Sequence, residues 1–299
     1  MKIGITGASG MLGTALVSRL SKIHAIFATS RSKGAEGQNI EWSCFDLTDT
    51  TLLNKWLETI KPDVVIHCAA IVNVDLCEDN VKLATKLHIE TTEVMANYLD
   101  SNGGRLIYIS TDSVFDGEKQ GAYSESDLVS PLNVYAKTKF FGEKSVQQMR
   151  NGLILRVNIV GWTQGKDASF FEWVLKGLID KVPLNLFHDV YFSPLHVDDL
   201  SLIIEKIIDR PIFGLYHCAS NDSISKYDFG MQMAKVFGLP DSNINRVSVE
   251  EMKFKANRPK NMVLNIEKIS FALEHDLPSV IDAIKLMKEQ HDKNGDLLN

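Results

Sequence analysis

The stretch that decides the fold is Thr6-Gly7-Ala8-Ser9-Gly10-Met11-Leu12-Gly13, close to the N-terminus. It follows a short apolar run at residues 2–6 and opens an amphipathic stretch at residues 11–21, so it joins an expected strand to an expected helix. The first glycine permits a tight turn, the second lets backbone amides approach a pyrophosphate, and the third lets the helix pack closely. This placement predicts a dinucleotide-binding turn, and a plain glycine-rich turn is the alternative.

Beyond this turn, short apolar runs alternate with longer amphipathic stretches, which is typical of βαβ units and a parallel sheet. Runs such as Val64-Val65-Ile66 lack period-two alternation, as strands covered on both faces should. Further strands are expected at residues 25–29, 41–45, 64–68, 105–110 and 153–157, and helices at 52–59, 81–100 and 134–150. The sequence therefore predicts an α/β fold with a Rossmann-type, doubly wound parallel sheet.

After about Gly161 the pattern becomes less regular and is interrupted by prolines. Helices are expected there at residues 170–179, 197–208 and 226–237. We expect residues 1–160 to form an NAD(P)-binding domain, to which later segments return. Residues 161–299 should form mainly a smaller C-terminal substrate-binding lobe over the carboxyl ends of the strands, where doubly wound sheets bind their ligands.

Composition excludes several classes of function. The chain has 299 residues and a formal net charge of −6, which gives no broad basic surface for nucleic acid. The N-terminus reaches glycine before a signal-peptide core can form, and no segment approaches ~20 uninterrupted apolar residues, so we expect a cytoplasmic protein without membrane contact. The cysteines and histidines lack the spacing of metal ligands, so no metal site is expected.

The end of the second expected strand, Thr29-Ser30-Arg31-Ser32-Lys33, bears on the choice of cofactor. An NAD-preferring site carries an acidic residue there to bind the ribose 2′-hydroxyl, and this chain has none. Arg31, helped by Ser30 or Lys33, can instead neutralise a 2′-phosphate. NADPH is therefore the expected cofactor and NADH a possible one, with a solvated basic turn as the alternative interpretation.

A tyrosine and a lysine are spaced for proton transfer. Tyr135 and Lys139 lie four residues apart, on one face of an expected helix. A neighbouring ammonium lowers the pKa of a phenol, and such a pair passes a proton to a carbonyl oxygen while a nicotinamide delivers hydride. Thr111, at the end of the expected strand 105–110, can donate a hydrogen bond to the same oxygen. These residues predict a carbonyl reductase.

The chain resembles the extended short-chain dehydrogenases/reductases, and in particular the dTDP-4-dehydrorhamnose reductase group. The motifs that carry the resemblance are residues 6–13, His67-Cys68-Ala69-Ala70, Ser110-Thr111-Asp112-Ser113-Val114-Phe115-Asp116-Gly117 and Pro131-Leu132-Asn133-Val134-Tyr135-Ala136-Lys137-Thr138-Lys139. The resemblance implies NADPH-dependent reduction of a keto group on a nucleotide-linked deoxysugar. It also implies a homodimer, formed through the helices at residues 81–100 and 134–150.

The resemblance also implies roles for individual residues. Thr111, Tyr135 and Lys139 form the catalytic triad. The cofactor contacts Gly7, Ser9, Gly10, Met11, Leu12, Gly13, Ser30, Arg31, Asp46, Leu47, Cys68, Ala69, Ala70, Tyr135 and Lys139. Within this set, Asp46 and Leu47 lie near adenine, and Ala69 and Ala70 lie beside the nicotinamide half. The substrate contacts Val114, Asn158 and Arg258, and the guanidinium of Arg258 can pair with a nucleotide diphosphate.

Two departures from the family pattern limit the assignment. His88 stands where the family usually has an asparagine that organises the proton path, so His88 either replaces it as a polar group or marks weakened activity. After the sixth strand the chain has Arg156-Val157-Asn158 in place of an Arg-Thr-Ser-Trp-type run, so the sugar need not be the rhamnose precursor. Asn158 either bonds the substrate or forms a turn.

Two alternative functions remain open. The first is a nucleotide-sugar epimerase or dehydratase, although dehydratases carry an acidic pair beside the catalytic hydroxyl and Thr111 is followed here by Asp112-Ser113. The second is a non-catalytic regulatory subunit, since the β subunit of methionine adenosyltransferase resembles the same reductase group.

Overall fold

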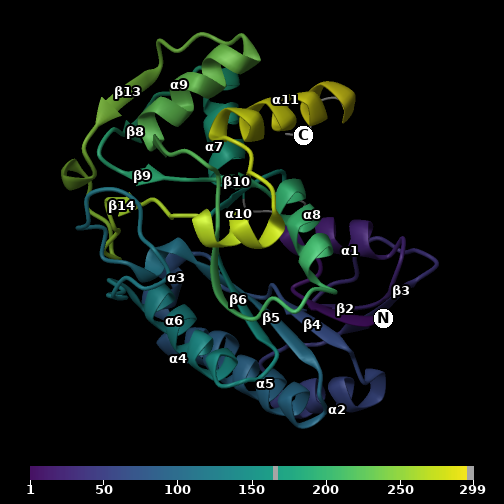
Figure 1. Ribbon diagram of the computed structural model, residues 1–299. Coiled ribbons are helices and arrows are strands. Elements are labelled where there is room, and N and C mark those ends of the chain that lie inside the picture. The colour runs from purple at the N-terminus through teal and green to yellow at the C-terminus, as the bar shows by residue number, and fades with distance from the viewer. Residues whose placement is uncertain (164–167, 295–299) are drawn as a thin grey trace.

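The computed structural model describes residues 1–163 and 168–294 (Figure 1). Its centre is a seven-stranded sheet with the strand order β11-β6-β5-β4-β1-β2-β3, and all neighbouring strands run parallel. The strands are β1 (Lys2–Thr6), β2 (Ala25–Ser30), β3 (Ile40–Cys44), β4 (Val64–His67), β5 (Arg105–Thr111), β6 (Gly152–Val157) and β11 (Gly214–Cys218). The order reverses between β1 and β4, so the predicted doubly wound fold is confirmed.

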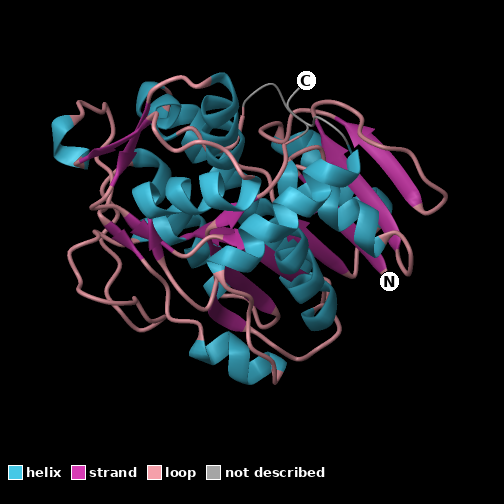
Figure 2. Cartoon of the chain, turned by 90° about the horizontal axis from the view of Figure 1, so that it is seen from above, coloured by secondary structure: helices cyan, strands magenta, loops and turns pink. Residues whose placement is uncertain are grey.

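Burial on both faces explains the apolar strand sequences. Every residue of β4 and of β6 is buried, and a separate apolar cluster lies on each face of the sheet. One face is covered by α1 (Met11–Leu20), α8 (Val197–Ile207) and α10 (Glu267–Leu273). The other is covered by α2 (Thr50–Ile60), α5 (Thr91–Ser101) and α6 (Val134–Gln147) (Figures 1 and 2). The sheet therefore forms the middle layer of three, with its carboxyl ends facing the rest of the chain.

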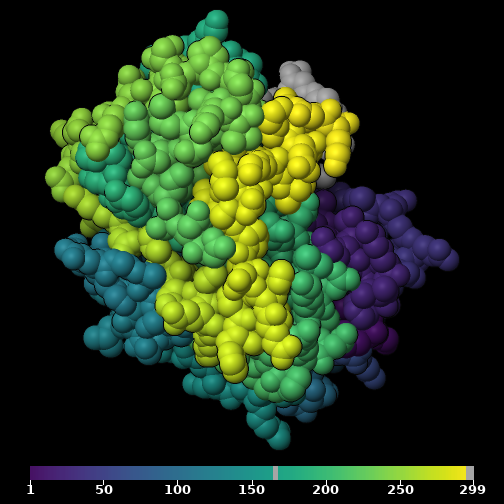
Figure 3. Space-filling model, turned by 45° about the horizontal axis from the view of Figure 1, so that its top comes forward, coloured from purple at the N-terminus to yellow at the C-terminus, as the bar shows by residue number. Residues whose placement is uncertain are grey.

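A second group of elements surrounds its own apolar cluster and forms the lobe. Its helices are α7 (Phe170–Asp180), α9 (Lys226–Phe237) and α11 (Val280–Asn294). In its short sheets, β8 (Leu184–Phe187) pairs with β13 (Ile244–Val247), and β9 (Tyr191–Phe192) lies between β12 (Ile224–Ser225) and β14 (Asn261–Met262). Figure 3 shows the C-terminal segment, in yellow, running from the sheet side onto the lobe.

The elements after residue 160 are divided between the two parts. Helices α8 and α10 and strand β11 pack on the large sheet, whereas α7, α9 and α11 pack in the lobe. The pair β7 (Ile159–Val160) and β10 (Leu195–His196) lies where the chain passes between them. Later segments of the chain thus return to the large sheet. No helix among the described residues is long and apolar enough to cross a membrane.

The structure differs from the predicted elements in a few places. The expected helix at residues 81–100 is divided into α4 (Val81–Thr85), a π-helical turn (Lys86–Glu90) and α5. The hydroxyls of Thr91 and Thr92 donate to the carbonyls of Leu87 and His88, at 2.5 and 2.8 Å, and so compete for backbone acceptors at this point. Strand β11 and the helices α3 (Val74–Asp79), α10 and α11 were not among the predicted elements.

Candidate functional site

The glycine-rich turn has the shape that a bound pyrophosphate requires. Gly7 has a φ of +64°, and a Cβ there would lie 2.7 Å from the backbone of Ala69. A Cβ on Gly13 would lie 2.2 Å from the Gly7 carbonyl oxygen, so only glycine lets α1 pack this close to β1. Gly10 is the N-cap of α1 and supplies no side-chain cap, which leaves the first amides of the helix for an anion. These residues fit a dinucleotide phosphate.

The other predicted residues of the turn differ in exposure. Ser9 and Met11 are partly exposed, whereas Leu12 is buried in the cluster under α1. Leu12 can therefore contact a cofactor only through its backbone, whereas the side chains of Ser9 and Met11 are accessible.

The residues predicted to bind the 2′-phosphate lie at the end of β2. Arg31 is exposed, and its side chain has no hydrogen-bond or ion-pair partner among residues 1–163 and 168–294. Lys33, by contrast, is paired with Glu36 at 2.5 Å. Asp46 lies near Arg31, and hydrogen bonds from Thr48 hold the pKa of its carboxyl below the usual value. Of the predicted basic residues, Arg31 is thus the one free to bind a 2′-phosphate.

We expect Arg31→Ala to weaken NADPH binding about 10- to 100-fold, because a charge-assisted hydrogen bond is lost. NADH, which has no 2′-phosphate, should bind as before. Fluorescence titration of both cofactors measures the difference. Lys33→Ala is the matched control and should change neither affinity, since Lys33 is already paired with Glu36. An equal loss for NADPH and NADH would remove Arg31 from the 2′-phosphate site.

The segment after β4 lies beside the glycine-rich turn. Cys68, Ala69 and Ala70 are partly exposed, and the Ala69 N–H donates to the Thr6 hydroxyl at 3.4 Å. Burial raises the pKa of the Cys68 thiol to about 12, with the charge of Lys139 acting in the opposite direction. Cys68 therefore stays protonated at neutral pH. This position, between turn and triad, suits the nicotinamide half of a dinucleotide.

The three predicted catalytic residues meet at the carboxyl end of β5. Thr111 is the last residue of β5, and its hydroxyl, which donates to Asp112 Oδ1 at 3.1 Å, is near enough to the Tyr135 phenol to lower its pKa. Tyr135 and Lys139 lie on α6, whose first turn is capped by the side chain of Asn133. The Lys139 Nζ donates to the carbonyl of Ile109 at 2.7 Å, which ties α6 to β5. The strand β5 and the helix α6 thus bring the threonine, the tyrosine and the lysine together in one acid–base cluster.

The pKa values in this cluster differ from the sequence-based expectation. Burial raises the pKa of Tyr135 to about 12, opposed by the nearby hydroxyl of Thr111. Burial also lowers the pKa of Lys139 to about 7, opposed by the charge of Glu143. The prediction of a lowered Tyr135 pKa is wrong, because burial disfavours the phenolate and the charge of Asp112 acts in the same direction. For Lys139, burial outweighs the charge of Glu143. Tyr135 therefore keeps its proton at neutral pH, as a proton donor must.

The three predicted substrate residues have different surroundings. Asn158 follows β6, and its Nδ2 donates to Oδ2 of Asp112 at 2.5 Å, directly beside Thr111. Arg258 is half-exposed and lies 3.4 Å from Asp75. The side chain of Val114 is wholly buried, so only its backbone is placed to meet a ligand. Of the three, Asn158 is the one beside the triad.

Comparison with known proteins places this geometry in a family. Residues 1–292 match the family model described as the RmlD substrate binding domain. The chain belongs to this family. It is similar to the crystal structure of a dTDP-4-dehydrorhamnose reductase from Clostridium acetobutylicum, with 30% identity, 98% of this chain and 100% of that chain covered, and a TM-score of 0.83.

Two further relatives bear on function. The dTDP-4-dehydrorhamnose reductase of Bacillus anthracis, solved in complex with NADP, is 26% identical, with 97% of this chain and 99% of that chain covered and a TM-score of 0.84. Methionine adenosyltransferase 2 subunit beta of Xenopus laevis is 33% identical over 278 residues, which are 89% of this chain and 80% of that protein. The expected relationship to the reductase group of the RmlD family is confirmed.

His88 departs from the usual asparagine but is fully bonded. Its Nε2 accepts the Ile71 N–H at 2.9 Å, so Nδ1 carries the proton and donates to the Thr138 hydroxyl at 2.8 Å. Thr138 in turn donates to the carbonyl of Val134 on α6. Burial lowers the pKa of His88 to about 3, so the ring is neutral. His88 therefore connects the segment after β4 to the catalytic helix and supplies no proton at neutral pH.

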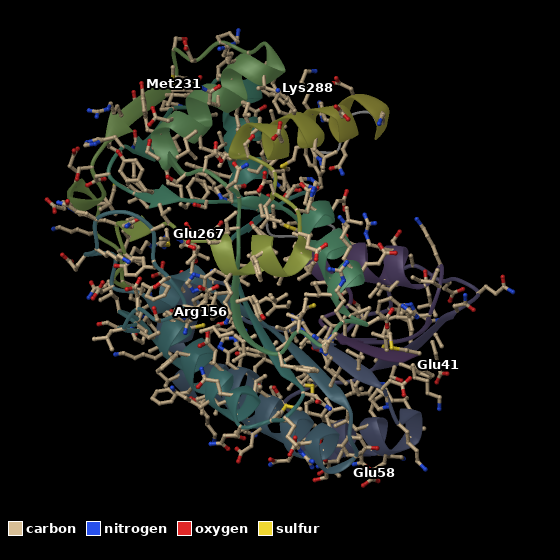
Figure 4. All side chains as sticks on the ribbon, in the orientation of Figure 1. Glu41, Glu58, Arg156, Met231, Glu267 and Lys288 are labelled. Carbon is tan, nitrogen blue, oxygen red and sulfur yellow. The ribbon has the colours of Figure 1, made fainter. Side chains whose placement is uncertain are left out.

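Sequence reasoning missed a buried ion pair behind the triad. Glu143, one turn beyond Lys139 on α6, accepts two hydrogen bonds from Arg156 of β6, at 2.9 and 2.7 Å. The hydroxyl of Ser110 donates to the same carboxylate at 2.5 Å. Figure 4 shows Arg156 in the interior, between the sheet and α6. An arginine inside an otherwise apolar strand was the signal that could have indicated this pair.

Proposed function

We propose that the chain is an NADPH-dependent reductase that acts on a keto group of a nucleotide-linked deoxysugar. The observation that carries the proposal is the meeting of Thr111, Tyr135 and Lys139 beside the glycine-rich turn. A turn alone serves many cofactor-binding proteins, and a tyrosine–lysine pair alone occurs on many helices. Together they supply a place for a nicotinamide and a proton donor for the oxygen of the substrate.

Each residue has a distinct part in this reaction. NADPH, when bound, supplies the hydride to the carbonyl carbon. The first amides of α1 hold the pyrophosphate, and Arg31 holds the 2′-phosphate. Tyr135 donates its proton to the carbonyl oxygen, and the hydroxyl of Thr111 orients that oxygen. Lys139, fixed by the Ile109 carbonyl, places a positive charge beside the phenolate that forms.

The substrate class is supported by the named relatives. Two reductases that share the fold over nearly the whole chain are named for dTDP-4-dehydrorhamnose. The site chemistry agrees, because a protonated phenol and a threonine hydroxyl suit a neutral carbonyl oxygen. The residues at the end of β6, Arg156-Val157-Asn158, replace the Arg-Thr-Ser-Trp-type run that carries an aromatic side chain in rhamnose-pathway reductases. We therefore propose that the substrate is either the rhamnose precursor or a related deoxysugar.

Turnover of NADPH tests the proposal. The purified protein should lose NADPH absorbance when dTDP-4-keto-6-deoxyglucose or a related keto-sugar nucleotide is added, and NADH should support a slower reaction. Binding of NADPH without consumption, over a panel of keto-sugar nucleotides, would contradict the reductase proposal.

A second candidate function is a regulatory subunit, and one observation favours it. The subunit beta of a methionine adenosyltransferase is 33% identical over most of the chain. Under this alternative, the protein binds NADPH without turnover and co-purifies with a synthetase. Affinity purification at native expression levels separates the two candidates.

We also propose a homodimer formed through α4, α5 and α6. The exposed apolar side chains of Val81 on α4 and Phe141 on α6 lie on the helices expected at the interface. Phe141→Glu should convert a dimer to a monomer, because burying an unpaired carboxylate is costly. Sedimentation equilibrium measures the mass, and an unchanged mass for the variant would place the interface elsewhere.

A further inference from the structure

One cation of the lobe faces the site and is held without an acceptor. Lys226 is the first residue of α9 and directly follows β12, the strand that pairs with β9. Its Nζ lies 3.2 Å from the ring centroid of Phe192 and 4.2 Å from that of Phe170. Among residues 1–163 and 168–294, the ammonium has no hydrogen-bond or ion-pair partner. The aromatic rings therefore hold it in place but leave its three N–H donors for another group.

The charges around Lys226 favour an incoming anion. Asp112 attracts the ammonium, whereas Arg258 repels it, and the positive end of α9 also disfavours a cation. Asp112 does not supply the missing contact, since no ion pair joins it to Lys226 and its oxygens instead accept hydrogen bonds from Asn158 at 2.5 Å, Thr111 at 3.1 Å and Ser113 at 3.2 Å. Burial lowers the pKa of Lys226 to about 7. The ammonium of Lys226 therefore has no negatively charged group in contact with it among the described residues.

The location of Lys226 indicates which part of a substrate supplies that group. The Phe192 ring beneath Lys226 belongs to β9, which pairs with β14, and Met262 of β14 accepts a hydrogen bond from the Ser113 hydroxyl at 3.8 Å. Lys226 therefore lies near Asp112, the residue between Ser113 and Thr111, and the charge of Asp112 acts on both Tyr135 and Lys226. In a pyranose ring, C4 and the anomeric carbon lie at opposite ends. A sugar whose C4 carbonyl meets Tyr135 therefore holds its anomeric phosphate one ring length from the triad, and Lys226 is the unpaired donor that the lobe offers near that position.

We propose that Lys226 is a substrate-binding residue that donates a hydrogen bond from the lobe to a phosphate oxygen of the sugar nucleotide. This inference rests on the proposed function, since it requires a nucleotide-linked sugar with its keto group at Tyr135. A phosphate beside Lys226 stabilises the ammonium form and raises its pKa from about 7. Binding at pH 8 should consequently take up most of one proton for each nucleotide bound.

Calorimetry with dTDP and with UDP tests the proposal without any need for turnover. Titrations at pH 8 in two buffers of different ionisation enthalpy give both the affinity and the proton uptake. Lys226→Met should weaken binding about 10- to 100-fold, as for other charge-assisted hydrogen bonds, and should abolish the uptake that depends on Lys226. NADPH should bind the variant as it binds the native chain, which shows that the fold is intact.

Lys288→Met is the matched control. Lys288 also belongs to the lobe and lies 5.7 Å from an aromatic ring centroid, that of Phe237, but it is paired with Asp292 at 2.7 Å. Its variant should bind dTDP as the native chain does. If the native chain binds dTDP or UDP and Lys226→Met binds it equally with equal proton uptake, the role of Lys226 is overturned and the proposed function stands. If the native chain binds NADPH but neither nucleotide, the proposed substrate class fails and the role of Lys226 fails with it.

Discussion

Tyr135→Phe should reduce kcat for keto-sugar reduction about 100- to 10,000-fold, the range that a positioned general acid contributes. The change removes only the hydroxyl that donates the proton. Burial raises the pKa of this phenol to about 12, so the native group is protonated throughout the neutral range and is ready to donate. Steady-state NADPH oxidation at saturating NADPH measures the loss in kcat, apart from any effect of the missing hydroxyl on cofactor affinity.

The control for this variant is Tyr98→Phe. Tyr98 lies on α5, outside the catalytic cluster, so loss of its hydroxyl should leave kcat unchanged. A Tyr135→Phe enzyme that retains native kcat would show that another group protonates the substrate. Loss of kcat in both variants would instead indicate a general effect of tyrosine replacement on the fold.

Glu143→Gln should lower the free energy of unfolding by about 3–5 kcal/mol, because it leaves the buried guanidinium of Arg156 without its carboxylate. Both side chains are almost fully buried, so water cannot replace the lost contact. Denaturant unfolding followed by tryptophan fluorescence measures the change. Asp292→Asn, which breaks the exposed pair with Lys288, is the matched control and should cost little.

The same variant should also change the pH dependence of the reaction. The charge of Glu143 raises the pKa of Lys139, which burial otherwise lowers to about 7. Without that charge the ammonium loses its proton at a lower pH, so the decline of activity on the alkaline side should move to lower pH. Native stability in Glu143→Gln would contradict the ion-pair argument, and an unmoved pH profile would contradict the coupling to Lys139.

The sheet was largely predictable because its strands are buried on both faces. An uninterrupted apolar run such as Val64-Val65-Ile66 predicts a strand that is covered on both faces, and every residue of β4 is buried. Strand β11 lies at an edge and carries mixed residues such as Tyr216 and His217, so its sequence has neither an apolar run nor clear alternation. The two-residue strands of the lobe are too short to produce a period at all.

The C-terminal helix was missed although its signal is present. Val280, Ile284 and Met287 are spaced four and three residues apart, and all three are buried against the lobe. Charged residues such as Asp282 and Lys285 lie between them, so the segment has no continuous apolar run. The spacing of apolar residues was here a better guide than mean polarity.

The predictable part of the site was its local part. The glycine-rich turn and the Tyr135–Lys139 pair are each contained in a few consecutive residues, and both lie where expected. The contacts of Glu143 with Arg156 and of Asp112 with Asn158 join elements that only folding brings together. The raised pKa of Tyr135 could not be predicted from the sequence either, because it depends chiefly on burial in the folded chain.

The most direct test of the central claim follows the hydride itself. The protein is incubated with a keto-sugar nucleotide and NADPH deuterated at the transferred position of the nicotinamide, and the product is analysed by mass spectrometry and NMR. We predict one deuterium on the former carbonyl carbon of the sugar, with NADP as the other product. A sugar product without deuterium, formed while the label stays on the cofactor, would contradict net reduction and indicate an epimerase or dehydratase.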